Sequence, residues 1–230
     1  MNAETDLRVF IGYDSREAIA YDVCKHSIER RTFTPISIDP LVQIALRANS
    51  LYTRPKDEKA STEFSLTRFL VPFLSEYKGW SLFCDCDFLW LSDIRKILTE
   101  ATDNYAVMVV KHDYTPKSVF KMDGKKQHVY PKKNWSSMIL WNCEHPSNQH
   151  LDLNVVNTAE PSYLHQFKWL ADHEIGELDA SWNCLSGYYD LTKANAIHYT
   201  DGGPWFPKYS NCEGSDAWNA EYEHYTNTFK

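Results

Sequence analysis

Two aspartates one residue apart, Asp85 and Asp87, follow an apolar run in the stretch SLFCDCDFLWLSD at residues 81–93. In an extended chain, residues two apart point the same way, so the two carboxylates form one patch of negative charge. Carboxylates this close repel each other unless a cation holds them ionised. Hard divalent ions such as Mn²⁺ or Mg²⁺ prefer oxygen ligands, so the pair predicts a metal site.

Two chemistries use an Asp-x-Asp pair after a strand. In haloacid-dehalogenase-like phosphatases, the first aspartate attacks phosphorus and the second handles the proton. That motif belongs near the amino terminus with Thr or Val two residues past the second aspartate, a place that Leu89 fills here. In nucleotide-sugar glycosyltransferases, the aspartates instead hold a metal that neutralises the departing diphosphate. Helix capping or surface ion pairing is a third possibility, and it needs no buried strand in front.

The surrounding segments predict strands and helices in alternation. Residues 7–11 are apolar and indicate a strand, and Asp14 then suits the start of a helix. Residues 61–77 place apolar side chains on one helical stripe, with a kink expected at Pro72. Further strands are predicted at 81–84, 105–110 and 136–142. This order favours an α/β fold, with a mostly parallel mixed sheet covered by helices.

Ligands of such sheets gather at the carboxyl ends of the strands. Four of the side chains that fall there on this prediction can bind ligands: Tyr13, Asp14, Asp85 and Asp87. Arg68 lies off the apolar stripe of its helix, so we expect it to reach a ligand or to face solvent.

The composition of the 230 residues indicates one compact globular unit. A net charge of -7 argues against nucleic-acid binding driven by overall charge, so an anionic ligand must meet local positive charge or a metal. The six cysteines lack paired C-x-x-C spacing and are expected to be reduced and mostly buried. No signal sequence or membrane-spanning run is evident, so a cytoplasmic location is expected.

Several stretches resemble nucleotide-sugar glycosyltransferases of the A-type (GT-A) fold, and most of all the family 8-like retaining group of glycogenin and galactosyltransferases. The specific part is SLTRFLVPFLSEYKGWSLFCDCDFLWLSDIRKIL at 65–98, which resembles that group's Arg-bearing helix and metal motif. VFIGYDSREAIAYDV at 9–23 resembles its first strand and nucleoside-binding turn. WSSMILWNCEHP at 135–146, WLADHEIGELDASWN at 169–183 and HYTDGGPW at 198–205 are similar to its sugar-facing strand, catalytic stretch and closing element.

The resemblance implies a single Rossmann-like GT-A domain over 1–230, with a nucleotide- and metal-binding half at 1–110 and an acceptor-binding and catalytic half at 111–230. It also implies roles for individual residues. Tyr13 and Asp14 would meet the nucleoside, Arg68 the donor, and Asp85, Asp87 and His198 the metal. Asp172, Glu174 and Asn183 are the candidates for catalysis and for gripping the donor sugar. A helix cap, a surface charge and an ordinary histidine remain the alternatives for Asp14, Arg68 and His198.

The closing element departs from the family pattern at one charged position. Gly202 and Gly203 let the backbone approach phosphate oxygens, and Trp205 can close over them. The family has a Lys before the Pro to meet the diphosphate, whereas this chain has Gly203, with a His-to-Trp spacing one residue shorter. Lys208 or Arg68 is the candidate substitute for that contact.

The expected function is metal-dependent transfer of a sugar, with retention, from a nucleoside-diphosphate sugar such as a UDP-sugar. The acceptor would be a glycan or a lipid-linked glycan, shaped by the Lys-containing segments 41–60 and 111–135. A binding protein that kept this fold and lost turnover is the main alternative from another class.

Overall fold

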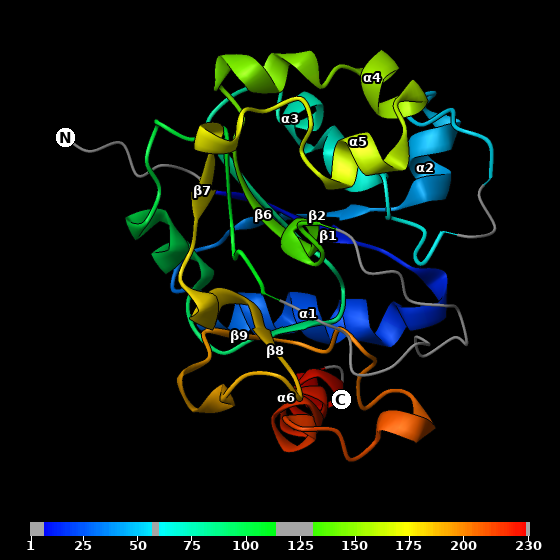
Figure 1. The fold of residues 1–230 in the computed structure, drawn as a ribbon. Coiled ribbons are helices and arrows are strands. Elements are labelled where there is room, and N and C mark those ends of the chain that lie inside the picture. Colours follow the sequence, from blue (N-terminus) through cyan, green and yellow to red (C-terminus); the bar gives the residue numbers. More distant parts are fainter. Residues whose placement is uncertain (1–6, 57–59, 114–130, 229–230) are drawn as a thin grey trace.

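The computed structural model describes residues 7–56, 60–113 and 131–228. In this part of the chain, a six-stranded sheet has the order β2-β1-β3-β6-β5-β7 (Figure 1). Its strands are β1 (Arg8–Gly12), β2 (Ser37–Leu41), β3 (Trp80–Cys84), β5 (Val107–Val109), β6 (Met138–Asn142) and β7 (Ile175–Glu177). β6 is antiparallel to its neighbours β3 and β5, whereas the β1–β2, β1–β3 and β5–β7 pairs are parallel. The predicted α/β class with a mostly parallel mixed sheet is confirmed.

Helices lie on both sides of this sheet (Figure 1). One side carries α2 (Gln43–Ala48), α3 (Val71–Leu74), α4 (Leu153–Thr158) and α5 (Pro161–His165). The other carries α1 (Ala18–Arg31), against which α6 (Ser215–Thr228) packs. A second sheet, with the order β4 (Phe88–Trp90), β9 (Ala196–His198), β8 (Cys184–Leu185), brings β4 against α1.

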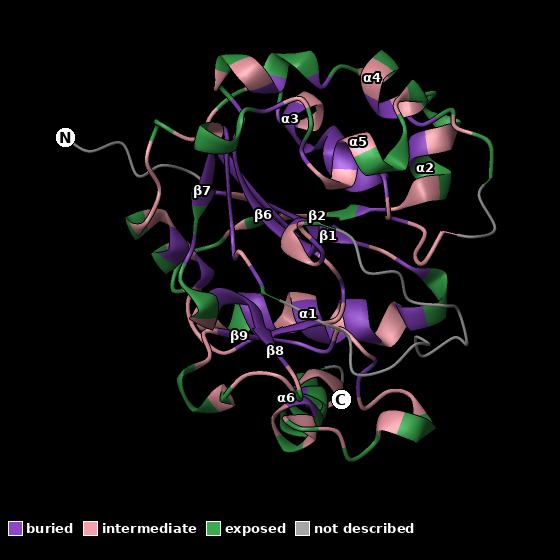
Figure 2. Ribbon diagram, in the orientation of Figure 1, coloured by how far each residue is buried: buried purple, intermediate pink, exposed green. Residues whose placement is uncertain are grey.

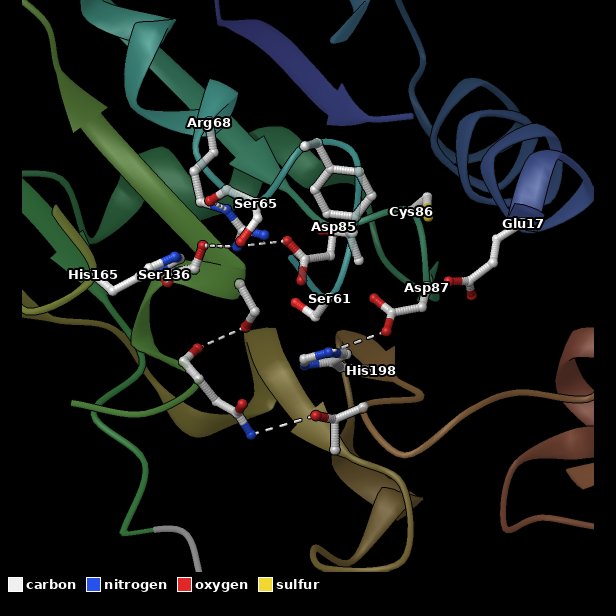
Figure 3. Close-up of a pocket in the computed structure, with 15 residues that line it drawn as sticks. Glu17, Ser61, Ser65, Arg68, Asp85, Cys86, Asp87, Ser136, His165 and His198 are labelled. Carbon is white, nitrogen blue, oxygen red and sulfur yellow. Dashed lines mark hydrogen bonds and ion pairs between the residues drawn. The ribbon is translucent and has the colours of Figure 1, made fainter. Parts of the chain in front are cut away.

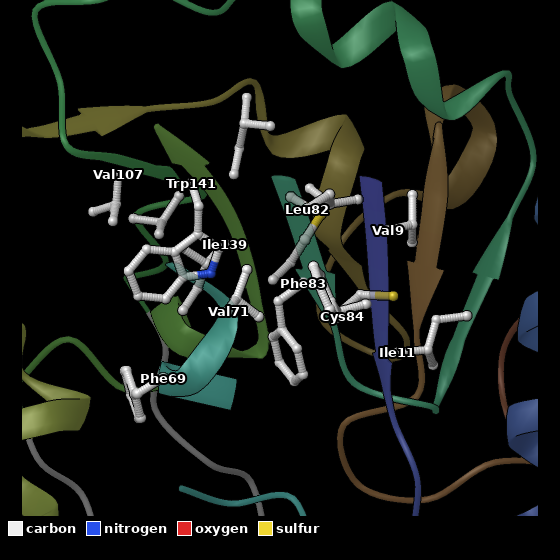
Figure 4. Packing of buried hydrophobic residues seen from close by; sticks show 14 of the residues in the cluster. Val9, Ile11, Phe69, Val71, Leu82, Phe83, Cys84, Val107, Ile139 and Trp141 are labelled. Atoms are coloured by element: carbon white, nitrogen blue, oxygen red, sulfur yellow. The ribbon is translucent and has the colours of Figure 1, made fainter. Parts of the chain in front are cut away.

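The core is built on the two central strands β3 and β6, in which every residue is buried (Figure 2). A mainly apolar, fully buried run such as Trp80–Cys84, in which Ser81 is the polar residue, is typical of a strand covered on both faces. Phe83 and Trp141 are fully buried there, and Phe69, just before α3, packs against Trp141 (Figure 4). Burying one such side chain contributes about 1.5–3 kcal/mol. This rigid centre fixes the ends of the strands from which the candidate site residues project.

The prediction of a continuous helix at 61–77 is wrong. A short 3₁₀ helix at Thr67–Leu70 leads directly into α3, and the residues before it form turns. Pro72 is the second residue of α3, where its missing N–H needs no intrahelical partner, so it belongs to the start of a helix and not to a kink. The apolar stripe is nevertheless real, since Phe69 and Leu70 are fully buried.

Several elements carry weak sequence signals. β2 contains Asp39 and Pro40 and is an edge strand, which tolerates a residue without an N–H. The strands of the smaller sheet have two or three residues, too few to show a period. The expectation of reduced thiols is confirmed: all six cysteines are free, and five of them are buried. None of the helices that the structure describes has the length and apolar character needed to cross a membrane.

Candidate metal centre and active site

The predicted aspartates line a pocket at one edge of the large sheet (Figure 3). Asp85 and Asp87 follow the carboxyl end of β3, and Ser136 and Ser137 precede β6, which runs the opposite way and therefore begins at the same edge. His198 reaches the pocket from the end of β9. The pocket encloses about 750 Å³, including the part that is open to solvent.

Asp85, Asp87 and His198 converge on one point in this pocket. Each offers a ligand atom, and these atoms all lie within 4.8 Å of one another. Nε2 of His198 is 3.4 Å from Oδ2 of Asp87. Two carboxylate oxygens and an imidazole nitrogen form a donor set that suits Mn²⁺ and also accepts other divalent ions. The three residues predicted as metal ligands are therefore brought together, and their chemistry fits a divalent ion.

Arg68 is buried beside this group, so the alternative of a surface charge is wrong. Its Nη1 lies 2.8 Å from Oδ1 of Asp85 and donates to the carbonyl oxygen of Ser136 at 2.6 Å. The guanidinium also lies over the rings of Phe64 and Phe83, at 5.3 and 4.9 Å from their centroids. Aromatic contact and ion pairing together allow a charged group to be buried in this position.

Glu17 is a buried carboxyl in the pocket that the sequence did not reveal. Burial raises its pKa to about 8, and the nearby charges of Asp87 and Asp14 act in the same direction. Its Oε2 accepts a hydrogen bond from Nε1 of Trp205 at 3.1 Å. A carboxyl with a strongly raised pKa in a pocket is typical of functional sites.

The nucleoside contacts proposed for Tyr13 and Asp14 stay predictions. Asp14 is fully buried and caps the turn at Ser15–Glu17 by accepting from the backbone N–H of Arg16. The Arg16 guanidinium and the backbone N–H of Glu63 also bond its carboxylate. The ring of Tyr13 packs edge-on against Tyr21. Asp14 therefore performs the structural role that its position after β1 also allowed.

In the closing element at 198–205, the indole of Trp205 packs directly on Gly203. A Cβ atom placed on Gly203 would lie 1.9 Å from the ring of Trp205, so the indole occupies the space that a side chain would need. Gly202 has a positive φ of 124° and is buried. Lys208 is exposed, with Nζ 5.2 Å from the ring centroid of Tyr209, and is not among the residues that line the pocket. Its contact with a diphosphate stays a prediction.

The three predicted catalytic residues have different surroundings. Asp172 is exposed and pairs with Lys132 at 2.9 Å. The carboxylate of Glu174 accepts hydrogen bonds from the Ser147 hydroxyl and from the backbone N–H of Ala171. Its carbonyl oxygen accepts from the backbone N–H of Ala106, which directly precedes β5. Glu174 therefore lies at the sheet edge opposite the pocket. Asn183 is fully buried and hydrogen-bonds His198. The structure thus brings Asn183 next to the group formed by Asp85, Asp87 and His198, whereas neither Asp172 nor Glu174 lines the pocket.

Small polar residues complete the pocket wall. Ser136 and Ser137 come from the stretch that resembles a sugar-facing strand, so their place follows the family pattern. His165, at the end of α5, bonds the Ser136 hydroxyl through Nδ1 at 2.9 Å and has no sequence signal of its own. Ser61 and Ser65 lie in the turns before Arg68, and their arrangement depends on the chain path there.

Comparisons with known proteins show which family the chain belongs to. It matches no protein-family model. It is 50% identical over 224 residues to Protein CDI of Arabidopsis thaliana, a match that covers 95% of this chain and 86% of that protein. An identity this high over nearly the whole length shows a common family.

Solved glycosyltransferases share the fold. The bifunctional glycosyltransferase WbbM matches with a TM-score of 0.61 and 15% identity over 96% of this chain, which spans only 50% of WbbM. GlyE of Streptococcus pneumoniae matches with a TM-score of 0.62 and 13% identity over 98% of this chain and 63% of GlyE. Galactosyltransferase LgtC, solved with donor and acceptor sugar analogues, matches with a TM-score of 0.55 and 12% identity over 94% and 95% of the two chains. The fold implied by the resemblance is confirmed: this chain belongs to the family of Arabidopsis Protein CDI and has the GT-A fold of glycosyltransferases.

Proposed function

We propose that the protein is a metal-dependent glycosyltransferase that transfers a sugar from a nucleoside-diphosphate sugar, such as a UDP-sugar, to a glycan or lipid-linked glycan. The observation that carries this proposal is the convergence of Asp85, Asp87 and His198 in a pocket of a GT-A fold. The fold also favours this chemistry over that of a phosphatase. Retention of the anomeric configuration stays a prediction from the family resemblance.

Asp85, Asp87 and His198 would hold the ion, Mn²⁺ or Mg²⁺. When bound, the ion supplies positive charge that stabilises the departing diphosphate. The Arg68 guanidinium, fixed by the Ser136 carbonyl and by Asp85, adds a second positive charge at the same edge of the pocket. Ser61 and Ser65 line the same pocket, and we propose their hydroxyl groups as partners for hydroxyls of the donor.

A screen of nucleoside diphosphates and nucleotide sugars with Mn²⁺ tests this proposal. We expect the matching nucleotide to raise the melting temperature of the protein in a Mn²⁺-dependent way. At a ligand concentration of one hundred times Kd, the stabilisation is about 2.7 kcal/mol. The double variant Asp85→Asn, Asp87→Asn is the control and should lose the shift. If no common nucleotide raises the melting temperature of the wild-type protein, the proposed donor site is refuted.

A nucleotide-sugar-binding protein without turnover is the second candidate. The packing of Trp205 onto Gly203 favours it, because the family's diphosphate-binding Lys has no counterpart at that position. Release or transfer of a labelled sugar from the donor found in the screen separates the two candidates. Binding that is tight and metal-dependent, with neither release nor transfer, would favour the second.

A further inference from the structure

We propose that Asn183 is a positioning residue that holds His198 in the tautomer and orientation in which Nε2 can bind a metal ion. The proposal rests on the metal site of the proposed function. It gives Asn183 a role different from the sugar contact that the family resemblance implies. Asn183 lies directly before β8, and Leu185 of β8 is paired with His198 of β9.

Packing fixes the plane of the His198 ring but not its orientation within that plane. The ring is 2% exposed and stacks on Phe88, with centroids 4.5 Å apart and an interplanar angle of 17°. A half turn about the Cβ–Cγ bond would leave this stacking nearly unchanged while exchanging the places of nitrogen and carbon atoms in the ring. A polar partner is therefore needed to select one of the two orientations.

The hydrogen-bond roles around Asn183 follow from one backbone carbonyl. The Ser137 hydroxyl lies 2.7 Å from the carbonyl oxygen of Asn134, which can only accept, so the hydroxyl donates there. Its oxygen then has only lone pairs left for Asn183. The Asn183 group that lies 3.0 Å from this oxygen must be the amide nitrogen, which donates to it.

The tautomer of His198 follows from the same chain of bonds. With the amide nitrogen of Asn183 directed at Ser137, its Oδ1 faces Nδ1 of His198 at 2.9 Å. A carbonyl oxygen accepts, so Nδ1 must carry the hydrogen. In the neutral ring, Nε2 is then the bare nitrogen, and it faces Oδ2 of Asp87 at 3.4 Å. Two electron-pair donors that face each other at this distance form a place for a cation.

Ser137 connects this arrangement to the other side of the metal group. Its carbonyl oxygen accepts from the backbone N–H of Asp85 at 2.8 Å. One residue directly before β6 therefore positions Asp85 through its backbone and His198 through Asn183. Asn183 is fully buried and both ends of its amide are engaged, so it acts through His198 and not by touching a substrate.

Two measurements on the full-length protein test the proposal. The first is ¹H–¹⁵N correlation spectroscopy of histidine-labelled protein in chelator at about pH 8, above the ordinary histidine pKa, which reports the tautomer without any metal. The second is Mn²⁺ affinity from electron paramagnetic resonance titration. Both are applied to the wild type, Asn183→Leu, Asn183→Asp and the control Asn148→Leu. Asn148 is an equally buried asparagine, bonded to Ala106 and Asn142 at the opposite edge of the sheet.

We expect the wild type to show the Nδ1–H tautomer at His198. Asn183→Leu should lose this preference and bind Mn²⁺ roughly 10- to 100-fold more weakly, as is typical when the partner of a ligating histidine is removed. Asn183→Asp keeps an acceptor facing Nδ1 and should retain most of the affinity. Asn148→Leu should unfold more easily but bind Mn²⁺ like the wild type.

An Nε2–H tautomer in the wild type, or unchanged Mn²⁺ affinity in folded Asn183→Leu, would overturn the proposal. If Asn183→Leu does not fold, Ser137→Ala takes its place, because loss of the hydroxyl removes the group that directs the amide; unchanged tautomer and affinity there would overturn it equally. A wild type that binds no Mn²⁺ refutes the proposed function instead, and the tautomer spectra still decide whether Asn183 orients His198.

Discussion

Two buried glutamates lie near opposite ends of α1 and have opposite electrostatic surroundings. Glu221 of α6 packs against the last turns of α1, where Arg30, Arg31 and His26 bond its carboxylate at 2.9, 2.7 and 2.7 Å. Glu17 precedes the first turn of α1, accepts a hydrogen bond from the neutral indole of Trp205 and has the carboxylates of Asp87 and Asp14 nearby. Both carboxyls are nearly inaccessible, at 1% and 3% exposed.

The pKa values express this difference. Burial alone would raise the pKa of Glu221, but hydrogen bonds from Arg30 and Arg31 outweigh it and lower the value to about 2. At Glu17, burial and the neighbouring carboxylates raise the pKa to about 8. The buried Glu221 carboxylate, with cations around it, contributes to holding α1 and α6 together. Acidic groups crowded in a pocket, as around Glu17, are typical of sites that bind a cation. Glu221 therefore supports the fold, whereas Glu17 belongs to the acidic pocket of the proposed metal site.

Neutralising the acidic pair of the pocket should have the largest effect. We expect Asp85→Asn with Asp87→Asn to abolish Mn²⁺ binding and sugar transfer. Removing crowded carboxylates relieves their repulsion, which offsets the cost of leaving the buried Arg68 without the Asp85 carboxylate, so the variant should still fold. Metal titration, transfer of a labelled sugar and thermal unfolding of the purified variant measure the three quantities. Undiminished transfer would contradict a metal role for the pair.

The corresponding change at the other end of α1 should affect stability and not binding. Glu221→Gln leaves Arg30 and Arg31 without their carboxylate partner and should lower the free energy of unfolding by about 3 kcal/mol. Mn²⁺ affinity should not change. Glu223→Gln, on the exposed side of α6, is the matched control and should stay within about 0.5 kcal/mol of the wild type. A loss of Mn²⁺ affinity in Glu221→Gln would break the comparison.

The pH dependence of the two glutamates should have opposite signs. Glu221 has a folded pKa of about 2, below its ordinary 4.5, so its stabilisation is present above pH 4.5 and is lost as the pH falls towards 2. Glu17 has a folded pKa of about 8, so the metal-free protein loses stability as the pH rises from 4.5 to 8.

The variant Glu17→Gln isolates the second effect. Chemical denaturation in chelator should show the variant to be more stable than the wild type, by about 1–2 kcal/mol near pH 7, since internal polarisability moderates the full effect. Below about pH 4.5, where Glu17 is protonated in both folded and unfolded chains, the two proteins should be equally stable. Parallel curves over the whole range would show that the pKa of Glu17 is the same in the folded and unfolded chains.

The sequence contained enough to predict Asp85, Asp87 and His198 as one group because their signals are local. Asp85 and Asp87 follow an apolar strand, and His198 precedes a glycine pair within a recognisable element. Glu17 gave no such signal, since a glutamate three residues after Asp14 indicates a helix start whether or not it is buried. Its burial depends on Trp205, which is 188 residues away in the chain.

The same distinction applies to the fold. The long apolar strands β1, β3 and β6 show a clear pattern, and their positions were predicted to within two residues. The antiparallel direction of β6 depends on the connections around it, which no local pattern encodes. The turns before Arg68 replaced an expected helix because tertiary contacts, such as the bond from Glu63 to Asp14, outweigh the helical period there.

The packing of Trp205 onto Gly203 limits how this protein can change. Restoring the family's lysine by a single Gly203→Lys substitution would drive the new side chain into the indole, which in turn would disturb the hydrogen bond to Glu17. A lysine at this position therefore requires the indole of Trp205 to move. With the indole in place, an anionic ligand of this pocket would have to meet its positive charge elsewhere, at Arg68.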